Sequence, residues 1–196
     1  MVTKGLDFDN VGIVGILSAD HLLQFPDFRA SERAFQLMTQ VSGRAGRKKK
    51  QGKVIIQAFD PSHAVINETL HHDFPAFFSR EIKERHTFLY PPFYRLIQIT
   101  LKHKKPQVLN GAAYSYVKFL KAQLGQQVIG PAVPSIPRVR NYYLMDVMIK
   151  MSRSAADIAR VKELIVAAGQ DLRKKEGYST VRININVDPY LSLIHI

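Results

Sequence analysis

The sequence predicts an α/β protein in two parts, and three observations carry this prediction. Two short apolar runs without alternation, at residues 11–17 and 53–57, flank a helical pattern, which is typical of parallel strands joined by a helix. Later segments alternate apolar and polar residues, as half-buried strands do, with helical patterns between them. Pro91 and Pro92 separate the two patterns. Because consecutive prolines cannot continue a helix, we place a domain boundary there.

The first part is predicted to begin with the strand over residues 11–17. A helix is expected from about Ser31, with Phe35 and Met38 on its apolar side, followed by the strand over 53–57. A second helix is predicted over 64–85. Since unbroken apolar runs suit strands that are covered on both faces, both strands are expected inside an α/β sheet.

The second part is predicted to run strand, helix, strand, strand, helix, strand, which is the split βαβ or ferredoxin-like arrangement. The strands are expected over residues 95–102, 127–129, 143–151 and 181–187, and the helices over 109–124 and 154–172. Gly125 supplies a stop for the first helix, and Ser154 with Asp157 resembles a capping box at the start of the second. Residues 191–196 resemble the translation of a sequencing adapter, so we leave them out of the fold as an artefact, with a short native tail as the alternative.

The chain has 196 residues, no cysteine and a formal net charge of +12. The charge is uneven, because residues 1–94 carry 12 basic and 10 acidic residues and residues 95–196 carry 16 and 6. A basic excess in one half is typical of a module that binds a polyanion, with solubility as the alternative. The absence of cysteine excludes a disulfide scaffold and a thiolate zinc site within this chain. The apolar run at 11–17 is too short for a membrane span, so we expect a cytoplasmic protein without membrane contact.

The strongest signal for chemistry is the segment Gln40-Val-Ser-Gly-Arg-Ala-Gly-Arg47. On a helix, Gln40, Arg44 and Arg47 stand at i, i+4 and i+7, so three side chains suited to phosphate point the same way. Gly43 and Gly46 each cost about 1 kcal/mol of helix propensity. Close approach of the backbone to a ligand or to another segment explains both glycines. The alternative is a solvated basic face shared with the three lysines that follow.

This segment resembles motif VI of the superfamily 2 helicases, and residues 1–11 resemble their motif V. Further matches follow in order along the chain at Ala19-Asp20, residues 25–33, Tyr90-Pro-Pro-Phe93, Gly130-Pro131 and Val187-Asp-Pro189. The ordered set resembles the C-terminal part of the PriA-type replication restart helicases, the primosomal protein N′ family. The resemblance covers nearly everything from Met1 to Tyr190.

The resemblance implies a domain organisation. Residues 1–75 would be the end of the second RecA-like helicase lobe, and residues 76–94 a connecting helix with the Pro-Pro linker. Residues 95–190 would be the family's C-terminal α/β domain, which has an S10-like fold. In the family, this domain contributes to DNA binding and to contact with single-stranded DNA-binding protein.

The resemblance also implies roles for single residues. Arg47 would be the arginine finger and Arg44 its companion on the γ-phosphate of ATP, where they stabilise charge as the bond to the leaving group breaks. Gln40 would link the nucleotide state to the position of the lobe. The nucleotide cleft would also be lined by Gly5 and Asp7, and the DNA backbone would be approached by Thr3 and Lys4.

The sequence lacks the parts of an ATPase site that precede these motifs. It has no Gly-x-x-x-x-Gly-Lys-Ser/Thr loop and no acidic box for Mg²⁺, so this fragment alone is not expected to hydrolyse ATP. ATP and Mg²⁺ are expected in the intact enzyme, together with zinc held by cysteines that the family carries upstream of motif V. Within this chain no metal site is expected, because His63, His71 and His72 lack metal-ligand spacing.

The basic half holds the candidate DNA contacts outside the helicase motifs. Tyr142 lies beside cationic residues, and an aromatic ring next to cations combines base stacking with phosphate contact on single strands. Cations at helix ends that favour the helix dipole are the alternative. The candidates are Lys102, Lys104, Lys105, Arg138, Arg140 and Tyr142.

Two functions therefore stand after the sequence analysis. The first is the C-terminal fragment of an ATP-dependent 3′ to 5′ DNA helicase acting in replication restart and primosome assembly, with forked or single-stranded DNA, single-stranded DNA-binding protein and other primosome proteins as partners. The second is a stand-alone basic module that binds nucleic acid or single-stranded DNA-binding protein without ATPase activity. The segment from Gln40 to Arg47 distinguishes them, since a binding module does not require it.

Overall fold

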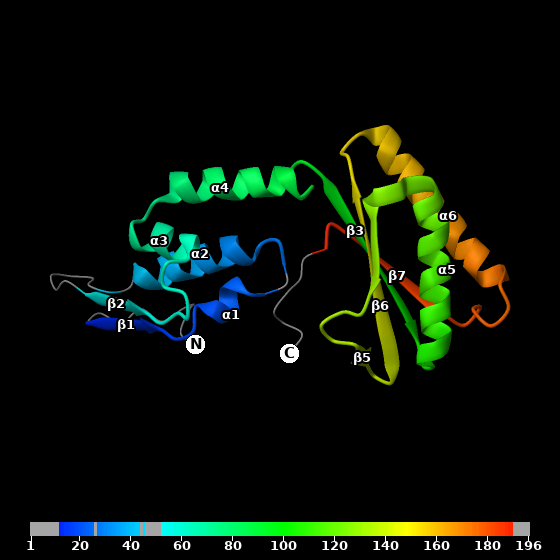
Figure 1. Ribbon diagram of the computed structural model, residues 1–196, viewed down its shortest axis with the longest axis horizontal. Helices are drawn as coiled ribbons and strands as arrows, with labels where there is room; N and C mark the ends of the chain where they lie inside the picture. Colours follow the sequence, from blue (N-terminus) through cyan, green and yellow to red (C-terminus); the bar gives the residue numbers. More distant parts are fainter. Residues whose placement is uncertain (1–11, 26, 44, 46–51, 190–196) are drawn as a thin grey trace. The chain divides into compact units, whose positions relative to one another are not determined.

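Figure 1 shows the computed structural model, which describes residues 12–25, 27–43, 45 and 52–189. The chain forms two compact units, of which the first ends at Thr87 and the second begins at Phe88. Each unit contains both helices and strands, so the predicted mixed α/β class is confirmed.

The first unit contains the predicted strand, helix and strand. Strands β1 (Ile13–Ile16) and β2 (Lys53–Ile56) pair in parallel, and helices α1 (Asp20–Leu23) and α2 (Ala30–Ser42) lie between them in the chain. A small apolar core forms where α2 meets the helices that follow β2. It is built from Ala19, Ala34, Phe35, Met38, Val65, Ile66 and Phe77.

The two strands of the first unit are not covered on both faces. Ile16 and Ile56 pack against the core, whereas Ile13 and Ile55 point the other way and are 65% and 49% exposed. Side chains alternate along a strand, and in the described residues the helices pack on one side of this pair only. The expectation of two covered faces is therefore wrong for the described part of the chain.

The long helix expected over residues 64–85 is also wrong, because the structure divides it into α3 (Ala64–Leu70) and α4 (Phe74–Thr87). His72 between them has a left-handed φ of 52°, which a continuous helix does not allow. The Asp73 carboxylate accepts a hydrogen bond from Ala76 N at 2.9 Å and so opens a new helix, with Pro75 in its first turn.

The second unit holds a larger sheet with two long helices (Figure 1). Its strands are β3 (Arg95–His103), β4 (Val128–Ala132), β5 (Arg138–Val139), β6 (Tyr142–Met151) and β7 (Arg182–Val187), and its helices are α5 (Pro106–Leu124) and α6 (Ala155–Lys174). The strands lie in the order β4-β6-β3-β7, each antiparallel to its neighbour, and the short β5 pairs with the start of β6. Strand β5 is an addition to the predicted elements.

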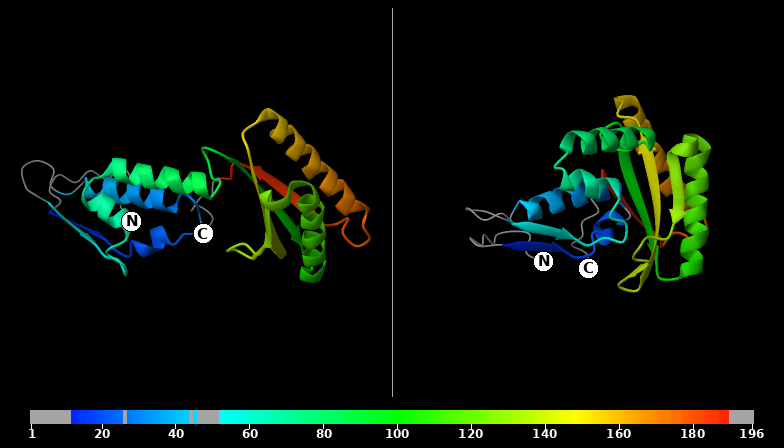
Figure 2. Two further views of the ribbon diagram at one scale, coloured as in Figure 1. Left: turned by 45° about the horizontal axis from the view of Figure 1, so that its top comes forward. Right: turned by 60° about the vertical axis from the view of Figure 1, so that its left-hand side comes forward.

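Both long helices cover the same face of this sheet, as Figures 1 and 2 show. Alternate residues of β3 and β6, such as Ile99 and Val147, point into the core below the helices and are fully buried. The residues between them, such as Thr100 and Asp146, point to the opposite face. Among the described residues of the second unit, no helix covers that opposite face, so it is called the open face below.

The predicted helix signals of the second unit are confirmed. Ser154 caps α6, with its Oγ accepting from Asp157 N at 3.1 Å, and Gly125 follows α5 with a φ of 56°. The reciprocal half of the capping box is different, because Ser154 N donates to Ser152 Oγ. Ser152 Oγ in turn donates to the Asp157 carboxylate.

Two of the ordered motifs contact other segments at the start of β3. In the first, Lys150 on β6 donates from Nζ to the Phe88 carbonyl at 2.6 Å and stands 3.7 Å from the centre of the Tyr90 ring. In the second, Asp188 accepts from Arg95 at 2.5 Å, and its own N–H donates to Leu96 O. Both motifs therefore stabilise the fold of the second unit.

Candidate nucleic-acid interface

The open face of the second unit is polar and basic. Three neighbouring strands present alternate side chains there, because in an antiparallel sheet directly paired residues share a face. The open-face residues that matter below are Gln98, Thr100 and Lys102 of β3, Tyr142 and Asp146 of β6, and Arg182, Asn184 and Asn186 of β7.

Tyr142 is the aromatic centre of this face. Arg182 Cζ lies 5.1 Å and Lys104 Nζ 5.9 Å from the centre of its ring, so cations from two other segments flank one half-buried tyrosine. An aromatic ring held between cations offers a stacking surface and charge for phosphate in the same place.

A second feature is a pair of like charges. Lys102 on β3 is directly opposite Arg182 on β7, and like charges in direct opposition destabilise a sheet. Among the described residues, no carboxylate forms an ion pair with Lys102, Lys104 or Arg182. This arrangement is unfavourable for the sheet alone and favourable for an anion bound above it.

Asp146 lies on the same face, but in the described part of the chain it forms no ion pair with these cations and accepts from two neutral side chains instead. Oδ1 accepts from Thr100 Oγ1 at 2.6 Å, and Oδ2 accepts from Gln98 Nε2 at 2.7 Å. This three-residue network fixes the middle of the open face and leaves the basic end uncompensated.

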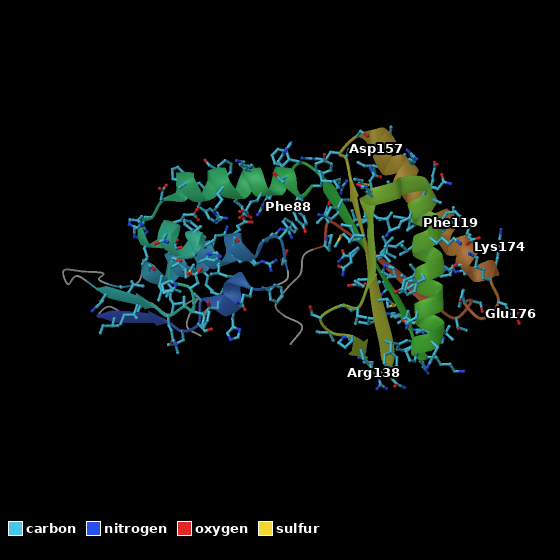
Figure 3. The ribbon with its side chains drawn as sticks, viewed as in Figure 1. Phe88, Phe119, Arg138, Asp157, Lys174 and Glu176 are labelled. Carbon is cyan, nitrogen blue, oxygen red and sulfur yellow. The ribbon has the colours of Figure 1, made fainter. Side chains whose placement is uncertain are left out.

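The β5–β6 hairpin divides the other predicted DNA contacts. Register pairing of Val139 with Tyr142 leaves Arg140 and Asn141 as a two-residue turn, and both have positive φ, at 46° and 67°. Arg138 pairs with Tyr143, and its Cζ lies 5.0 Å from that ring on the side facing the core. Figure 3 labels Arg138 on this hairpin.

The structure therefore brings together only part of the predicted set. Lys102, Lys104 and Tyr142 share the open face, whereas Arg138 lies on the covered side, Arg140 at the hairpin tip and Lys105 at the start of α5. The missed residue is Arg182. Its signal was present in the alternation of β7, where it stands opposite in phase to Ile183, but the pairing of β7 with β3 was needed to place it beside Tyr142.

Most of the predicted nucleotide site, and the two DNA contacts predicted in motif V, lie outside the described residues. Thr3, Lys4, Gly5, Asp7, Arg44 and Arg47 are all in segments that the structure does not describe. Gln40 is exposed near the end of α2 and lines a groove of about 550 Å³ between α2 and α4.

The helix that was expected to carry all three motif VI side chains ends early. Helix α2 stops at Ser42, and Gly43 and Ala45 lie in turns. The low helix propensity of glycine accounts for the stop at Gly43. Of the three motif VI side chains, Gln40 alone lies in the described part of the chain, so their shared helical face stays a prediction.

The histidines considered for a metal have other roles. His63 caps α3 by accepting from Val65 N at 3.3 Å, and His71 Nδ1 lies 2.8 Å from Asn67 O. Across the described ranges, no three His, Asp or Glu side chains gather as metal ligands would. None of the described helices is long and apolar enough to cross a bilayer.

Comparisons with known proteins match nearly the whole chain. Residues 86–190 match the family model described as the primosomal protein N C-terminal domain, which is just over half of the chain. Replication restart protein PriA of Bacillus subtilis (strain 168) is 39% identical over 195 residues, which is 98% of this chain and 24% of that relative. The proteins of the same name from Treponema pallidum (strain Nichols) and Thermotoga maritima are 40% and 33% identical over 76% and 87% of this chain. The chain thus spans about a quarter of the length of these relatives.

Proposed function

The chain belongs to the PriA family of replication restart proteins, and we propose that it is the C-terminal part of an ATP-dependent 3′ to 5′ DNA helicase that acts in replication restart and primosome assembly. The observation that carries the proposal is the similarity to a replication restart protein over 98% of this chain. The proposed place of action is the cytoplasm, because bacteria such as those that carry these relatives keep their DNA there.

The two units support a division of labour. We assign residues 1–75 to the end of a RecA-like second lobe, residues 76–94 to a connecting helix and linker, and residues 95–190 to an S10-like, ferredoxin-like C-terminal domain. The parallel pair β1-β2 supports the first assignment, since RecA-like lobes are built on parallel strands. The order β4-β6-β3-β7 with two helices on one face supports the last.

In the proposed mechanism, this chain supplies the side chains that respond to the nucleotide. Arg47 acts as the arginine finger and Arg44 as its companion on the γ-phosphate, while Gln40 couples the nucleotide to the lobe and Gly5 with Asp7 lines the cleft. ATP and Mg²⁺ supply the phosphoryl chemistry in the intact enzyme, where the phosphate-binding loop is expected outside this sequence. No cysteine is available to hold zinc, so zinc does not fit this chain.

The proposed partners are forked or single-stranded DNA, single-stranded DNA-binding protein and other primosome proteins. Thr3 and Lys4 are assigned to the DNA backbone beside the helicase cleft. In the second unit, Lys102, Lys104 and Tyr142 form the proposed contact, with Lys105, Arg138 and Arg140 outside that cluster. The uncompensated charge of the open face supports this part of the proposal.

The test is Arg47→Ala in the full-length protein, with Lys48→Ala as the matched loss of one positive charge next to it. DNA-stimulated ATP hydrolysis should fall about 10³-fold or more in Arg47→Ala and stay near normal in Lys48→Ala. If Arg47→Ala hydrolyses ATP at the normal rate, Arg47 is not the arginine finger.

A second function, a basic module that binds nucleic acid or single-stranded DNA-binding protein without ATPase activity, is favoured by the open face of the second unit. It predicts that the 196-residue chain binds DNA in a strongly salt-dependent manner. An affinity that does not change between 50 mM and 200 mM salt would count against it.

A further inference from the structure

We propose that the open face of the second unit is a track for single-stranded DNA along β7, in which Tyr142 stacks one base and the amides of Asn184 and Asn186 bind the edges of the bases that follow. The inference deepens the proposed function and rests on it, because DNA is the ligand in both. It assigns roles to Arg182, Asn184 and Asn186, which lie outside the DNA contacts predicted from the sequence.

Tyr142 supplies the ring on which a base stacks. The ring is half-buried, and Lys104 Nζ and Arg182 Cζ lie 5.9 Å and 5.1 Å from its centre. A ring fixed in this way loses little conformational entropy when a base stacks on it. Bases in a duplex are already stacked inside the helix and cannot reach a ring on a flat sheet, so this geometry favours a single strand.

Lys102 and Arg182 form the site for the phosphate next to the stacked base. Lys102 and Arg182 are directly opposite one another across β3 and β7, with no carboxylate partner among the described residues. A phosphate above this pair forms two charge-assisted contacts and relieves their mutual repulsion. A phosphate bound here therefore gains more binding free energy than a phosphate bound at two isolated surface cations would.

The spacing of residues along β7 sets the direction of the DNA strand. Open-face residues of β7 follow at every second position, from Arg182 to Asn184 to Asn186, which is about 7 Å per step. This step is close to the repeat of one nucleotide in an extended, unstacked strand. A DNA strand with one phosphate bound at Arg182 can therefore extend along β7, with one nucleotide for each open-face residue.

The side-chain amides of Asn184 and Asn186 are placed to recognise bases. Thr100 and Gln98, the register partners of Asn184 and Asn186, are held by Asp146 and are not free to turn. Asn184 and Asn186 are exposed, and in the described part of the chain neither side-chain amide has a hydrogen-bond partner. An asparagine amide matches the N6 and N7 edge of adenine, so the track should prefer adenine to thymine.

The experiment uses the full 196-residue chain in fluorescence anisotropy titrations, repeated at a series of salt concentrations, with fluorescein-labelled 15-mers of dA and dT and a 15-base-pair duplex. The variants are Tyr142→Ala, Tyr142→Phe, Arg182→Gln and Asn184→Ala with Asn186→Ala. Lys174→Gln is the matched charge control, because Lys174 lies on α6, which covers the other face of the sheet (Figure 3). Circular dichroism confirms that each variant is folded.

Tyr142→Ala should weaken binding of both single strands roughly tenfold, while Tyr142→Phe keeps the ring and should bind more tightly than Tyr142→Ala. Arg182→Gln should lower the slope of log K against log salt by about one. The double asparagine variant should bind dA and dT equally, and Lys174→Gln should change neither affinity more than about twofold.

Unchanged single-strand binding by folded Tyr142→Ala would overturn the inference, and so would duplex binding that is as tight as single-strand binding and equally sensitive to Tyr142. If Tyr142→Ala does not fold, Arg182→Gln carries the decision, because unchanged affinity and salt slope in that variant would overturn the inference equally. These failures leave the proposed helicase function standing. That function fails separately, if the full-length Arg47→Ala protein keeps normal ATP hydrolysis.

Discussion

Lys102 and Arg182 are register partners on β3 and β7, with both side chains on the open face of the sheet and no carboxylate partner among the described residues. Cross-strand pairs of like charge destabilise a sheet by roughly 0.2–1 kcal/mol. A protein that keeps such a pair in the free state gives up stability where a bound anion would restore it.

Arg182→Gln should therefore stabilise the free protein. Removing one charge relieves the repulsion with Lys102, and a gain of about 0.5 kcal/mol raises the melting temperature of a domain of this size by roughly 2–4 °C. Calorimetry at low salt measures the shift, and at about 1 M salt it should nearly vanish because the repulsion is screened. An equal shift at both salt concentrations would mean that repulsion is not its cause.

Gly130→Ala should destabilise the second unit more than Gly125→Ala does. Gly130 has a φ of 108°, and a Cβ there would lie 2.9 Å from Asp146 O on the neighbouring strand β6. Gly125 also has a positive φ, of 56°, but a Cβ there meets nothing within 4 Å. We expect a loss of roughly 1–2 kcal/mol at Gly125 from backbone conformation alone, and a larger loss at Gly130 from the added clash. Urea unfolding of both variants gives the comparison, and equal losses would contradict it.

The sequence was sufficient for the elements of the second unit other than β5, because local chemistry determines them. Alternation along β3 and β6, the Ser154 cap and the stop at Gly125 all act within a few residues. The break between α3 and α4 was missed because apolar spacing continues across it. The local signals were Asp73 and Pro75, which open a helix, and they were outweighed by the length of the pattern.

The candidate interface was less predictable than the fold. Lys102, Lys104 and Tyr142 could be singled out from their positions in the sequence, but Arg138 and Arg140 could not be separated from them without the hairpin register. Arg182 is distant in sequence and joins the site only through the pairing of β7 with β3. Such pairing depends on long-range contacts that no local pattern encodes.

The second unit should lose stability in acid through Asp188. The hydrogen bond from Arg95 holds the pKa of Asp188 below its ordinary value, as the hydrogen bond from Ser152 does for the pKa of Asp157. A carboxylate with a lowered folded pKa stabilises the fold above its unfolded pKa of about 4, and this contribution disappears as the pH falls through the folded value.

Asp188→Asn should therefore flatten the dependence of the unfolding free energy on pH below about pH 4 and leave the region from pH 5 to 7 flat. Arg95→Gln should flatten it similarly, because it removes the donor that lowers the pKa of Asp188. Urea unfolding at a series of pH values measures both variants. A slope below pH 4 that is as steep in Asp188→Asn as in the unaltered protein would exclude Asp188 as a source of the acid loss.

Arg85→Ala should weaken the first unit through a buried carboxylate. Arg85 joins α4 to α2 by donating from Nη2 to Glu32 at 2.8 Å and to Glu81 at 3.1 Å, and Glu81 is only 7% exposed. Burial raises the pKa of Glu81, so its charge is already unfavourable there. Removing its closest cation leaves that charge poorly compensated, and we expect a loss of about 3 kcal/mol at neutral pH.

The measurement is hydrogen exchange of α3 and α4 amides in the 196-residue chain, with Lys83→Ala, an exposed cation on the same helix, as the control. Protection should fall in Arg85→Ala and hold in Lys83→Ala. Adding Glu81→Gln to Arg85→Ala should restore most of the protection, because the double variant buries no charge at that position. Lowering the pH should also restore protection in Arg85→Ala, because the raised pKa of Glu81 favours its protonated, neutral form in the folded state. If Arg85→Ala loses no more protection than Lys83→Ala, the contact with Glu81 does not hold α4 against α2.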